Sequence, residues 1–409
     1  MKFFYYLALK IYEIIICFFS NFNEKARFFR NGRKNIFEKI EKNVPKSEKK
    51  IWFHCASMGE FEQALPLIEI IKKEFPEMKI LLTFFSPSAY EIRKNYKNAD
   101  YIFYLPLDFK KNAKKFIELT NPYLVFFIKY EFWFYYLKIL KEKNIPVYLI
   151  SGIFREDQIF FKNYGKWFAN ILRNFTHIFV QNKISLKLLE KIKIKNVTIA
   201  GDTRFDRVAD IVKINKNFDL IEKFKDNKKI LIAGSTWKED EEILIKYINN
   251  TKKKLKFIIA PHEIHKENIN RILKKIKISK IAYSQANEKN IKNKNVLIID
   301  NIGMLSSIYK YGEISYVGGA FGKGLHNILE PATFGMAIFF GIKYKKFQEA
   351  IDLINLKAAF SIKNFENFEK KINEILENKN LLEESSRISK NYIIENLGGT
   401  KKILKKIAI

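Results

Sequence analysis

Residues 51–75 read IWFHCASMGEFEQALPLIEIIKKEF and contain, in order, an apolar run, a small-residue turn and an amphipathic segment. The apolar run at 51–56 has the length and the aromatic and β-branched content of a strand. From Phe61 onward the apolar residues recur at intervals of three and four, which predicts a helix. A strand that passes through a short turn into a helix is the repeating unit of a parallel sheet covered by helices.

The same alternation continues along the chain. Further strand-like runs lie at 80–85, 101–107, 123–130, 147–150, 177–181 and 197–201. After a polar, charged stretch at 213–229, a second series follows at 229–235, 256–262, 295–300, 313–319 and 336–341. The pattern predicts an α/β protein of two doubly wound parallel sheets, with a cleft between them that the loops after the strand ends would face.

The length of 409 residues suits two domains better than one compact core. We predict an N-terminal helix at 1–24, a first domain at 25–212 and a second domain at 213–409, whose last part, from about residue 379, is helical and basic. The two cysteines, Cys17 and Cys55, lie on dissimilar segments and do not suggest a disulfide framework. A reducing cytoplasmic setting fits this composition.

The chain carries a formal net charge of +30. Such an excess predicts attraction to an anion, which could be nucleic acid, a phospholipid surface or a phosphorylated substrate. Charge alone does not choose among these. The chain is also rich in Lys, Asn and Ile, so part of the excess can reflect coding bias on solvated faces.

Residues 1–20, MKFFYYLALKIYEIIICFFS, are strongly apolar but contain Lys10 and Glu13. The run is short for a spanning helix, and no small-residue cleavage site follows, which argues against a removed signal peptide. Basic residues come next: Lys25, Arg27, Arg30, Arg33 and Lys34. An apolar helix beside a cationic cluster predicts an anchor that lies in, or just crosses, the inner face of an anionic membrane. The alternative is a helix that packs on the protein itself.

Two carboxylates follow predicted strands of the first sheet. Glu60 lies in the first turn of the predicted helix, where it could take a proton from a substrate hydroxyl, or could merely compensate the helix dipole. Glu131 follows the run at 123–130 and is embedded among aromatic residues, where a charge is costly without a partner. It is either functional or paired with Lys129 or another base.

A third candidate, Arg204, follows the strand-like run at 197–201, in the segment Gly201–Asp206. A fixed cation at the predicted domain junction could stabilise negative charge on a leaving phosphate. An interdomain salt bridge is the structural alternative.

The second half contains a glycine-rich segment, GGAFGKGLHNILEP, at 318–331. Its four glycines would let the backbone approach an anion, and a helix predicted to begin near Asn327 would point its N-terminus at the same place. Glu330 could bind ribose hydroxyls. The segment matches neither G-x-G-x-x-G after a first strand nor a Walker loop, which argues against an oxidoreductase or an ATPase. A turn that binds nothing is the alternative.

Three more loops follow strands of the second series: 234–236, 261–263 and 302–304. Together they would outline a nucleotide pocket at one sheet edge. The histidines do not form a recognised zinc spacing, and His262 and His265 alone would make a weak two-ligand site, so we expect no metal and no resident cofactor.

Four segments, WFHCASMGEFEQALPLI, KYEFW, GDTRFDRV and GGAFGKGLHNILEPATFG, resemble the bacterial 3-deoxy-D-manno-octulosonic acid (Kdo) transferases. They occur in the same order as in that family, and the resemblance covers nearly the whole chain. It implies the GT-B architecture of two Rossmann-like domains. It also implies transfer of Kdo from CMP-Kdo to the lipid A precursor, lipid IVA, on the cytoplasmic face of the inner membrane, in lipopolysaccharide biosynthesis.

The resemblance also implies roles for individual residues. Glu60 would be the catalytic base that deprotonates a glucosamine hydroxyl, and Glu131 and Arg204 would stabilise the transition state. The implied CMP-binding positions are Pro261, His262, Ile302, Gly303, Met304, Asn327, Ile328, Leu329 and Glu330. Many family members carry Arg at the position of His262 and Lys at that of Arg204, so a neutral His262 would hold phosphate less strongly.

The implied reaction is an inverting displacement without a metal ion. Two other functions stay open at this stage. One is a GT-B enzyme that uses another sugar nucleotide, such as a UDP-sugar transferase or epimerase. The other is a basic nucleic-acid-binding protein, against which the aromatic residues argue, because they lie in strand-like runs and not interleaved with the basic residues.

Overall fold

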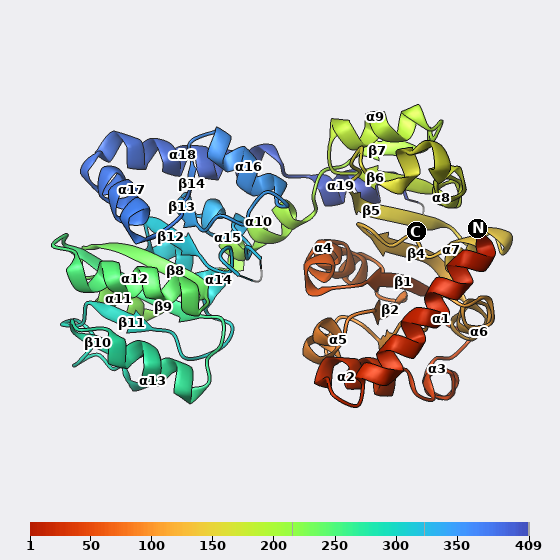
Figure 1. Ribbon diagram of the computed structural model, residues 1–409, viewed down its shortest axis with the longest axis horizontal. Helices are drawn as coiled ribbons and strands as arrows, with labels where there is room; N and C mark the ends of the chain where they lie inside the picture. Colours follow the sequence, from red (N-terminus) through yellow and green to blue (C-terminus); the bar gives the residue numbers. More distant parts are fainter. Residues whose placement is uncertain (215, 323, 408–409) are drawn as a thin grey trace. The chain divides into compact units, whose positions relative to one another are not determined.

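The computed structural model describes residues 1–214, 216–322 and 324–407. The chain divides into two compact units (Figure 1): unit 1 is Met1–Arg207 with Leu397–Ile409, and unit 2 is Val208–Asn396. Each unit contains one seven-stranded sheet in which neighbouring strands run parallel. This confirms the predicted pair of doubly wound sheets, while the predicted cleft between them stays a prediction.

The elements of unit 1 alternate between helix and strand after three N-terminal helices. Its helices are α1 (Lys2–Phe19), α2 (Glu24–Arg33), α3 (Ile36–Asn43), α4 (Met58–Glu74), α5 (Pro87–Arg93), α6 (Lys110–Thr120), α7 (Phe134–Glu142), α8 (Lys166–Leu172), α9 (Lys183–Lys191) and α19 (Gly399–Leu404), with the short 3-10 turns η1 (Ile159–Phe161) and η2 (Asn163–Gly165). Its strands are β1 (Lys50–Cys55), β2 (Lys79–Phe84), β3 (Tyr101–Tyr104), β4 (Pro122–Ile128), β5 (Val147–Gly152), β6 (His177–Val180) and β7 (Val197–Ile199).

The strand order of sheet 1 is β3-β2-β1-β4-β5-β6-β7, so the direction of winding reverses between β1 and β4. Both faces of the sheet are buried because helices cover both (Figure 1). Alternate residues of β1 enter opposite cores: Trp52 packs with one, and Ile51 and Phe53 pack with the other. This two-sided burial explains why the strands read as continuous apolar runs.

Helix α10 (Arg204–Ile214) begins in unit 1 and continues into unit 2. The other helices of unit 2 are α11 (Asp219–Lys225), α12 (Lys238–Asn250), α13 (Lys266–Lys275), α14 (Leu305–Ile308), α15 (Leu329–Thr333), α16 (Gln348–Asn355), α17 (Phe365–Glu377) and α18 (Lys379–Glu395), with η3 (Tyr283–Gln285) and η4 (Tyr309–Tyr311). Its strands are β8 (Lys229–Thr236), β9 (Leu255–Pro261), β10 (Lys280–Ala282), β11 (Val296–Ile298), β12 (Ile314–Val317), β13 (Ala337–Phe340) and β14 (Ala359–Ser361).

Sheet 2 has the order β10-β11-β9-β8-β12-β13-β14 and reverses its winding between β8 and β12. Every strand-like run predicted from the sequence contains a strand of one of the two sheets. The sequence analysis missed the two outer strands, β10 and β14. Both are three residues long and lie at the two edges of sheet 2.

The structure divides the chain differently from the predicted boundary at 212/213. Unit 2 begins at Val208, and the last residues return to unit 1 instead of staying in the second domain. The Asp206 carboxylate explains the return, because it accepts the N–H groups of Gly398 at 2.6 Å and Thr400 at 2.7 Å at the start of α19. Ile403 of α19 is then buried in one of the two cores of unit 1.

Helix α1 belongs to unit 1 and packs on it with one side. Tyr5, Leu9, Tyr12 and Ile16 recur at helical spacing and pack against the protein, and the Tyr5 hydroxyl donates to Asp108 Oδ2 at 2.6 Å. The exposed large apolar residues of α1 are Phe3, Phe4, Tyr6, Leu7, Ile11, Ile14, Ile15, Phe18 and Phe19. The helix therefore packs on the protein, as the alternative prediction had it, and also presents an apolar surface to its surroundings.

Within the described ranges, no helix taken alone has the length and apolar content needed to cross a membrane. The pair α1 and α2 meets that test by length and composition when taken together, with a bend of 119° between them.

Candidate active site

Glu60 lies at the carboxyl edge of sheet 1, where the winding reverses, which is where open α/β sheets bind their ligands. It is the third residue of α4, and its Oε2 accepts the N–H groups of Ala56 at 2.5 Å and Ser57 at 3.2 Å. These bonds satisfy backbone donors at the helix N-terminus, so Glu60 does compensate the helix start. Both go to Oε2, and no hydrogen bond between described residues uses Oε1.

Glu60 is buried, with 7% of the residue exposed. Burial, followed by the charge of Glu131, raises the pKa of Glu60 to about 8, although the two backbone N–H groups and Lys129 oppose the rise. A carboxyl group with such a pKa is a much stronger base, once ionised, than an ordinary glutamate. Opposed environmental effects of this kind are typical of functional sites.

Glu131 follows β4, the strand next to β1, and is 6% exposed. The backbone of Lys129 adopts a left-handed conformation with φ of 65°, which breaks the strand just before Glu131. The Glu131 Oε2 lies 2.9 Å from His54 Nε2 and 2.5 Å from Trp133 Nε1. A buried carboxylate needs hydrogen-bond partners, and Glu131 has two. One of them is a histidine of the neighbouring strand β1.

His54 connects Glu131 to the interior of the sheet. It is fully buried on β1, and its Nδ1 lies 2.9 Å from the Thr83 hydroxyl, which also accepts from Trp52 Nε1 at 2.7 Å. Because an indole N–H can only donate, Oε2 of Glu131 is an acceptor for Trp133, and an Nε2–H of His54 would donate to the same oxygen. The pair of donors fixes the position of the Glu131 carboxylate.

Arg204 begins α10 and is held by Asp202. Its Nη2 and Nε lie 2.8 Å and 3.0 Å from Asp202 Oδ2. Asp202 also accepts from Gln63 at 3.1 Å, one turn after Glu60 on α4, and from Gln181 at 3.2 Å. Although burial opposes it, the Arg204 charge and these hydrogen bonds hold the pKa of Asp202 below its usual range. This ion pair joins two residues of unit 1.

The Tyr130 hydroxyl interacts electrostatically with two of the candidate residues, Glu60 and Arg204. Burial raises the pKa of the Tyr130 hydroxyl, and the charge of Glu60 adds to the rise. The charges of Arg155 and Arg204 oppose it. The three predicted catalytic residues, Glu60, Glu131 and Arg204, therefore gather around one edge of sheet 1. Two carboxylates and one fixed guanidinium at one place could accept a proton and stabilise an anion.

The glycine-rich loop of unit 2 also lies where its sheet reverses winding, after β12 and beside the end of β8. Gly319 has φ of 93° and Gly324 has φ of 123°, and a Cβ on Gly319 would collide with the carbonyl oxygen of Gly324. The buried Asp240 anchors the loop by accepting the Gly319 N–H at 2.9 Å. Glycine is thus required by conformation and space at Gly319, apart from any ligand.

Three rings stack beside this loop. The His262 ring lies 4.4 Å from that of Trp237 and 4.7 Å from that of His326, with interplanar angles of 27°. Trp237 Nε1 donates to His326 Nε2 at 3.0 Å, so that nitrogen carries no proton. Burial and the neighbouring His262 lower the pKa of His326 to about 4. The stack joins the loops after β8, β9 and β12 into one surface.

The predicted nucleotide-binding positions differ in exposure. Pro261 is buried and His262 is exposed in the loop that ends β9, while Ile302 is 88% exposed and precedes Gly303, which is also exposed and has φ of 91°. The side chains of Met304, Ile328 and Leu329 are buried in unit 2, so only their backbone could reach a ligand.

Asn327 and Glu330 belong to the start of α15. Asn327 Nδ2 donates to Glu330 Oε1 at 3.2 Å, and its Oδ1 accepts the Leu329 N–H at 3.1 Å. The predicted helix near Asn327 exists, but it begins at Leu329 and has only five residues. Its macrodipole is correspondingly small, so the anion-binding argument from the helix is weaker than the sequence suggested.

Sequence reasoning missed His54, Trp133 and Asp202 as members of the site. A buried polar residue inside an apolar strand was the available signal for His54, but it does not identify a partner 77 positions away. Among the described residues, no group of three or more His, Cys, Asp or Glu side chains is placed to hold a metal ion.

A family model described as 3-deoxy-D-manno-octulosonic-acid transferase (kdotransferase) matches residues 26–207. The 3-deoxy-D-manno-octulosonic acid transferase of Rickettsia bellii is 32% identical over 354 residues, which cover 84% of this chain and 82% of that protein. The protein of the same name from Aquifex aeolicus is 29% identical over 375 residues, covering 88% of this chain and 98% of that protein.

A solved structure of S. aureus MnaA with UDP is similar in fold, with a TM-score of 0.59 at 14% identity, over 87% of this chain and 95% of that one. This likeness concerns the fold, two parallel-sheet units of the GT-B class, and not the reaction. Fold, motifs and relatives agree, and the chain belongs to the Kdo transferase family of glycosyltransferases.

Proposed function

We propose that this enzyme transfers Kdo from CMP-Kdo to the lipid A precursor, lipid IVA, in lipopolysaccharide biosynthesis. The observation that carries the proposal is the buried Glu60 carboxyl beside Glu131 at the edge of sheet 1, with its pKa raised to about 8. Membership of the family supports Kdo as the transferred sugar. The donor CMP-Kdo and the acceptor lipid IVA are what we propose beyond it.

In the proposed reaction, Glu60 acts as the general base. As the hydroxyl oxygen of the acceptor bonds to the anomeric carbon of Kdo, its proton passes to Glu60, and we assign Oε1 as the receiving atom because Ala56 and Ser57 occupy Oε2. The bond between Kdo and the CMP phosphate breaks with the electron pair going to the phosphate. Attack from the opposite face inverts the anomeric centre.

Arg204 and the loops of unit 2 would stabilise the departing CMP. Asp202 fixes the Arg204 guanidinium, so little reorganisation is needed when charge develops on the phosphate. We assign CMP binding to Pro261 and His262, to Ile302–Met304 and to Asn327–Glu330. In this scheme the leaving-group charge is met by side chains and backbone N–H groups, and no metal ion takes part.

We further propose that the enzyme works at the cytoplasmic face of the inner membrane. The exposed apolar side of α1 and the basic residues of α2 together suit an anionic bilayer surface, where apolar burial and cation attraction add. Replacing Phe4 and Phe18, which are 65% and 62% exposed, by Ser should weaken sedimentation with anionic vesicles. Ile184→Ser, at an exposed apolar residue of α9, is the matched control and should bind as wild type. Equal binding by all variants would contradict the assignment of α1 as the membrane surface.

The test of the reaction is incubation of the full chain with CMP-Kdo and tetraacylated lipid A precursor in detergent, followed by the mass of the lipid product. Glu60→Gln should abolish transfer and leave CMP binding nearly unchanged, because only the proton acceptor is lost. Glu69→Gln makes the same change on the same helix and should keep activity. Turnover of a UDP-sugar in place of CMP-Kdo would reject the donor, and an active Glu60→Gln enzyme would reject the base.

A further inference from the structure

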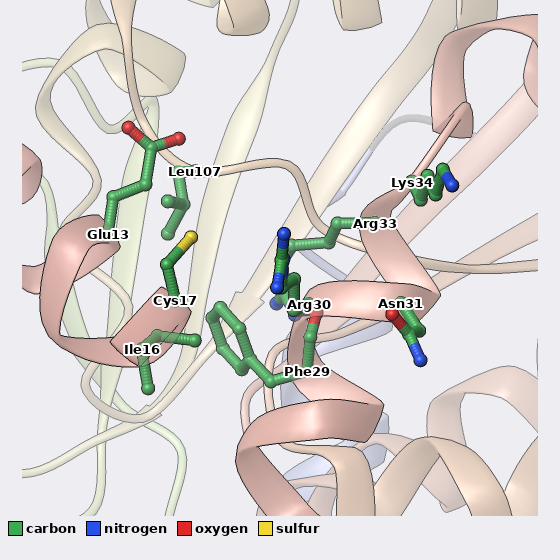
Figure 2. A pocket seen from close by; sticks show the side chains of 9 residues that line it. All are labelled: Glu13, Ile16, Cys17, Phe29, Arg30, Asn31, Arg33, Lys34 and Leu107. Carbon is green, nitrogen blue, oxygen red and sulfur yellow. Dashed lines mark hydrogen bonds between the residues drawn. The ribbon is translucent and has the colours of Figure 1, made fainter. Parts of the chain in front are cut away.

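A pocket of about 500 Å³ lies between α1 and α2 in unit 1. Figure 2 shows Ile16 and Cys17 of α1 on one wall and Phe29, Arg30 and Arg33 of α2 on the other. A second hollow of about 340 Å³ adjoins it and shares Arg33. The size is that of a pocket for a small molecule or for part of a lipid.

One part of the pocket is apolar. Ile16 packs with the small core formed by the side chains of Phe29, Leu107 and Phe109, and Phe29 is only 5% exposed. Cys17 is exposed and lines the same wall. A hydrocarbon chain lying along these side chains would remove apolar surface from water.

The other part of the pocket is cationic. The Arg33 guanidinium lies 3.6 Å from the Phe29 ring centre and donates to the backbone carbonyls of Leu105, Phe29 and Phe85. None of the ion pairs between described residues includes Arg33, so its charge is desolvated without a carboxylate. Burial lowers the pKa of Arg33 for that reason, although a guanidinium stays charged at neutral pH.

Other charged side chains near Arg33 add to the positive charge of the pocket. Arg30 and Lys34 line the same pocket with exposed side chains. The one carboxylate in the lining, Glu13, is already paired with Lys10 Nζ at 2.7 Å. An anion in the pocket would therefore meet three cations whose charge no lining carboxylate cancels.

We infer that this pocket binds one anionic phospholipid of the bilayer, with its phosphate at Arg30, Arg33 and Lys34 and an acyl chain along Ile16 and Phe29. The inference rests on the proposed membrane surface, because the exposed apolar side of α1 is the part of the molecule that would bring the pocket to lipid. A free phosphate would use only the cations and would leave the apolar wall uncovered. The combination of both walls in one pocket is the reason to assign a lipid.

The experiment uses Cys17 as a reporter in the full chain. Cys55 is fully buried, so a thiol reagent such as iodoacetamide should modify Cys17 selectively, and the rate is read by mass spectrometry. Monomeric short-chain phosphatidylglycerol should slow this reaction. Phosphatidylcholine with the same chains lacks the net charge, and glycerol phosphate lacks the chains, so both should protect much less at equal concentration.

Two arginines of α2 provide a matched pair. Arg30→Ala should weaken protection by phosphatidylglycerol about tenfold or more, as expected for loss of a charge-assisted hydrogen bond. Arg27→Ala removes the same charge from an exposed residue of the same helix outside the pocket and should change it less than about twofold. Lys34→Ala is a second pocket variant in case Arg30→Ala is unstable.

Three results would overturn the inference. They are equal protection by phosphatidylcholine, equal protection by glycerol phosphate, and equal losses for Arg27→Ala and Arg30→Ala, which would indicate a diffuse surface potential. Kdo transfer by the wild-type enzyme is measured in the same preparation. Protection of Cys17 without Kdo transfer would reject the proposed function and keep the lipid pocket. Kdo transfer without protection of Cys17 would reject the lipid pocket and keep the proposed function.

Discussion

The raised pKa of Glu60 predicts how transfer depends on pH. With a pKa of about 8, about one molecule in ten has the ionised base at pH 7 and about one in a hundred at pH 6. We therefore expect kcat/KM for the acceptor to rise about tenfold per pH unit below pH 8 and to level off above it. An ordinary glutamate would be fully ionised throughout this range.

Glu131→Gln tests the cause of the shift. Burial is the larger contribution to the raised pKa of Glu60, and the Glu131 charge is the second. Glutamine keeps an acceptor for the His54 and Trp133 donors but removes the charge. The rise of kcat/KM with pH, the acidic limb of the pH profile, should therefore move to lower pH. Glu69→Gln, on the same helix as Glu60, should leave the limb in place even if the rate changes.

The assay is the initial rate with tetraacylated precursor at saturating CMP-Kdo, measured from the usual pKa of glutamate to above pH 8. The acceptor phosphates titrate near pH 6, so their effect is distinguished by its position from the change expected near pH 8 for Glu60. A wild-type limb centred near 4.5 would refute the raised pKa. A limb near 8 that Glu131→Gln leaves unmoved would refute the electrostatic link between the two carboxylates.

Three further outcomes are expected. The folded pKa of Glu60 lies above the usual 4.5 of a glutamate, so this group stabilises the fold fully below about pH 4.5. The effect is lost at about 1.4 kcal/mol per pH unit as the pH rises to about 8. Glu60→Gln should therefore raise Tm relative to wild type at pH 8 and above, and a lower Tm there would contradict this. Asp202→Asn weakens the hold on Arg204 and should cost about 1–3 kcal/mol in urea unfolding together with a lower kcat, whereas an unchanged kcat would show that the guanidinium needs no such support. Gly319→Ala should abolish CMP binding in a calorimetric titration. Gly398→Ala, at almost the same φ (92°) but with open space for a Cβ, should cost only about 1 kcal/mol of stability and bind CMP normally. Similar losses of CMP binding in both variants would mean that backbone strain alone is responsible.

Local sequence determined which segments form strands and helices. Runs such as 51–56 and 123–130 are apolar throughout because both faces of each sheet are buried, and the helices between them keep a period of three and four. It also determined that Glu60, Glu131 and the glycine-rich loop lie at carboxyl edges, since in parallel sheets the residue after a strand is always at that edge. The four motifs, in their order along the chain, were sufficient to predict the Kdo transferase family.

Only the tertiary structure decided which side chains pair with the candidate site residues. His54 meets Glu131 because β1 and β4 are neighbours at the reversal of sheet 1, and that strand order is not encoded in either segment. The return of α19 to unit 1 depends in the same way on Asp206 accepting the N–H groups of a distant turn.

The two sides of α1 show the same division of information. Its strongly apolar composition was readable from the sequence, but the side that packs on the protein is shown by contacts such as the bond from Tyr5 to Asp108. Periodicity records how a segment relates to its own neighbours along the chain. The pairing of distant side chains, and with it the pKa of Glu60, is set by sheet order and burial, which only the folded molecule possesses.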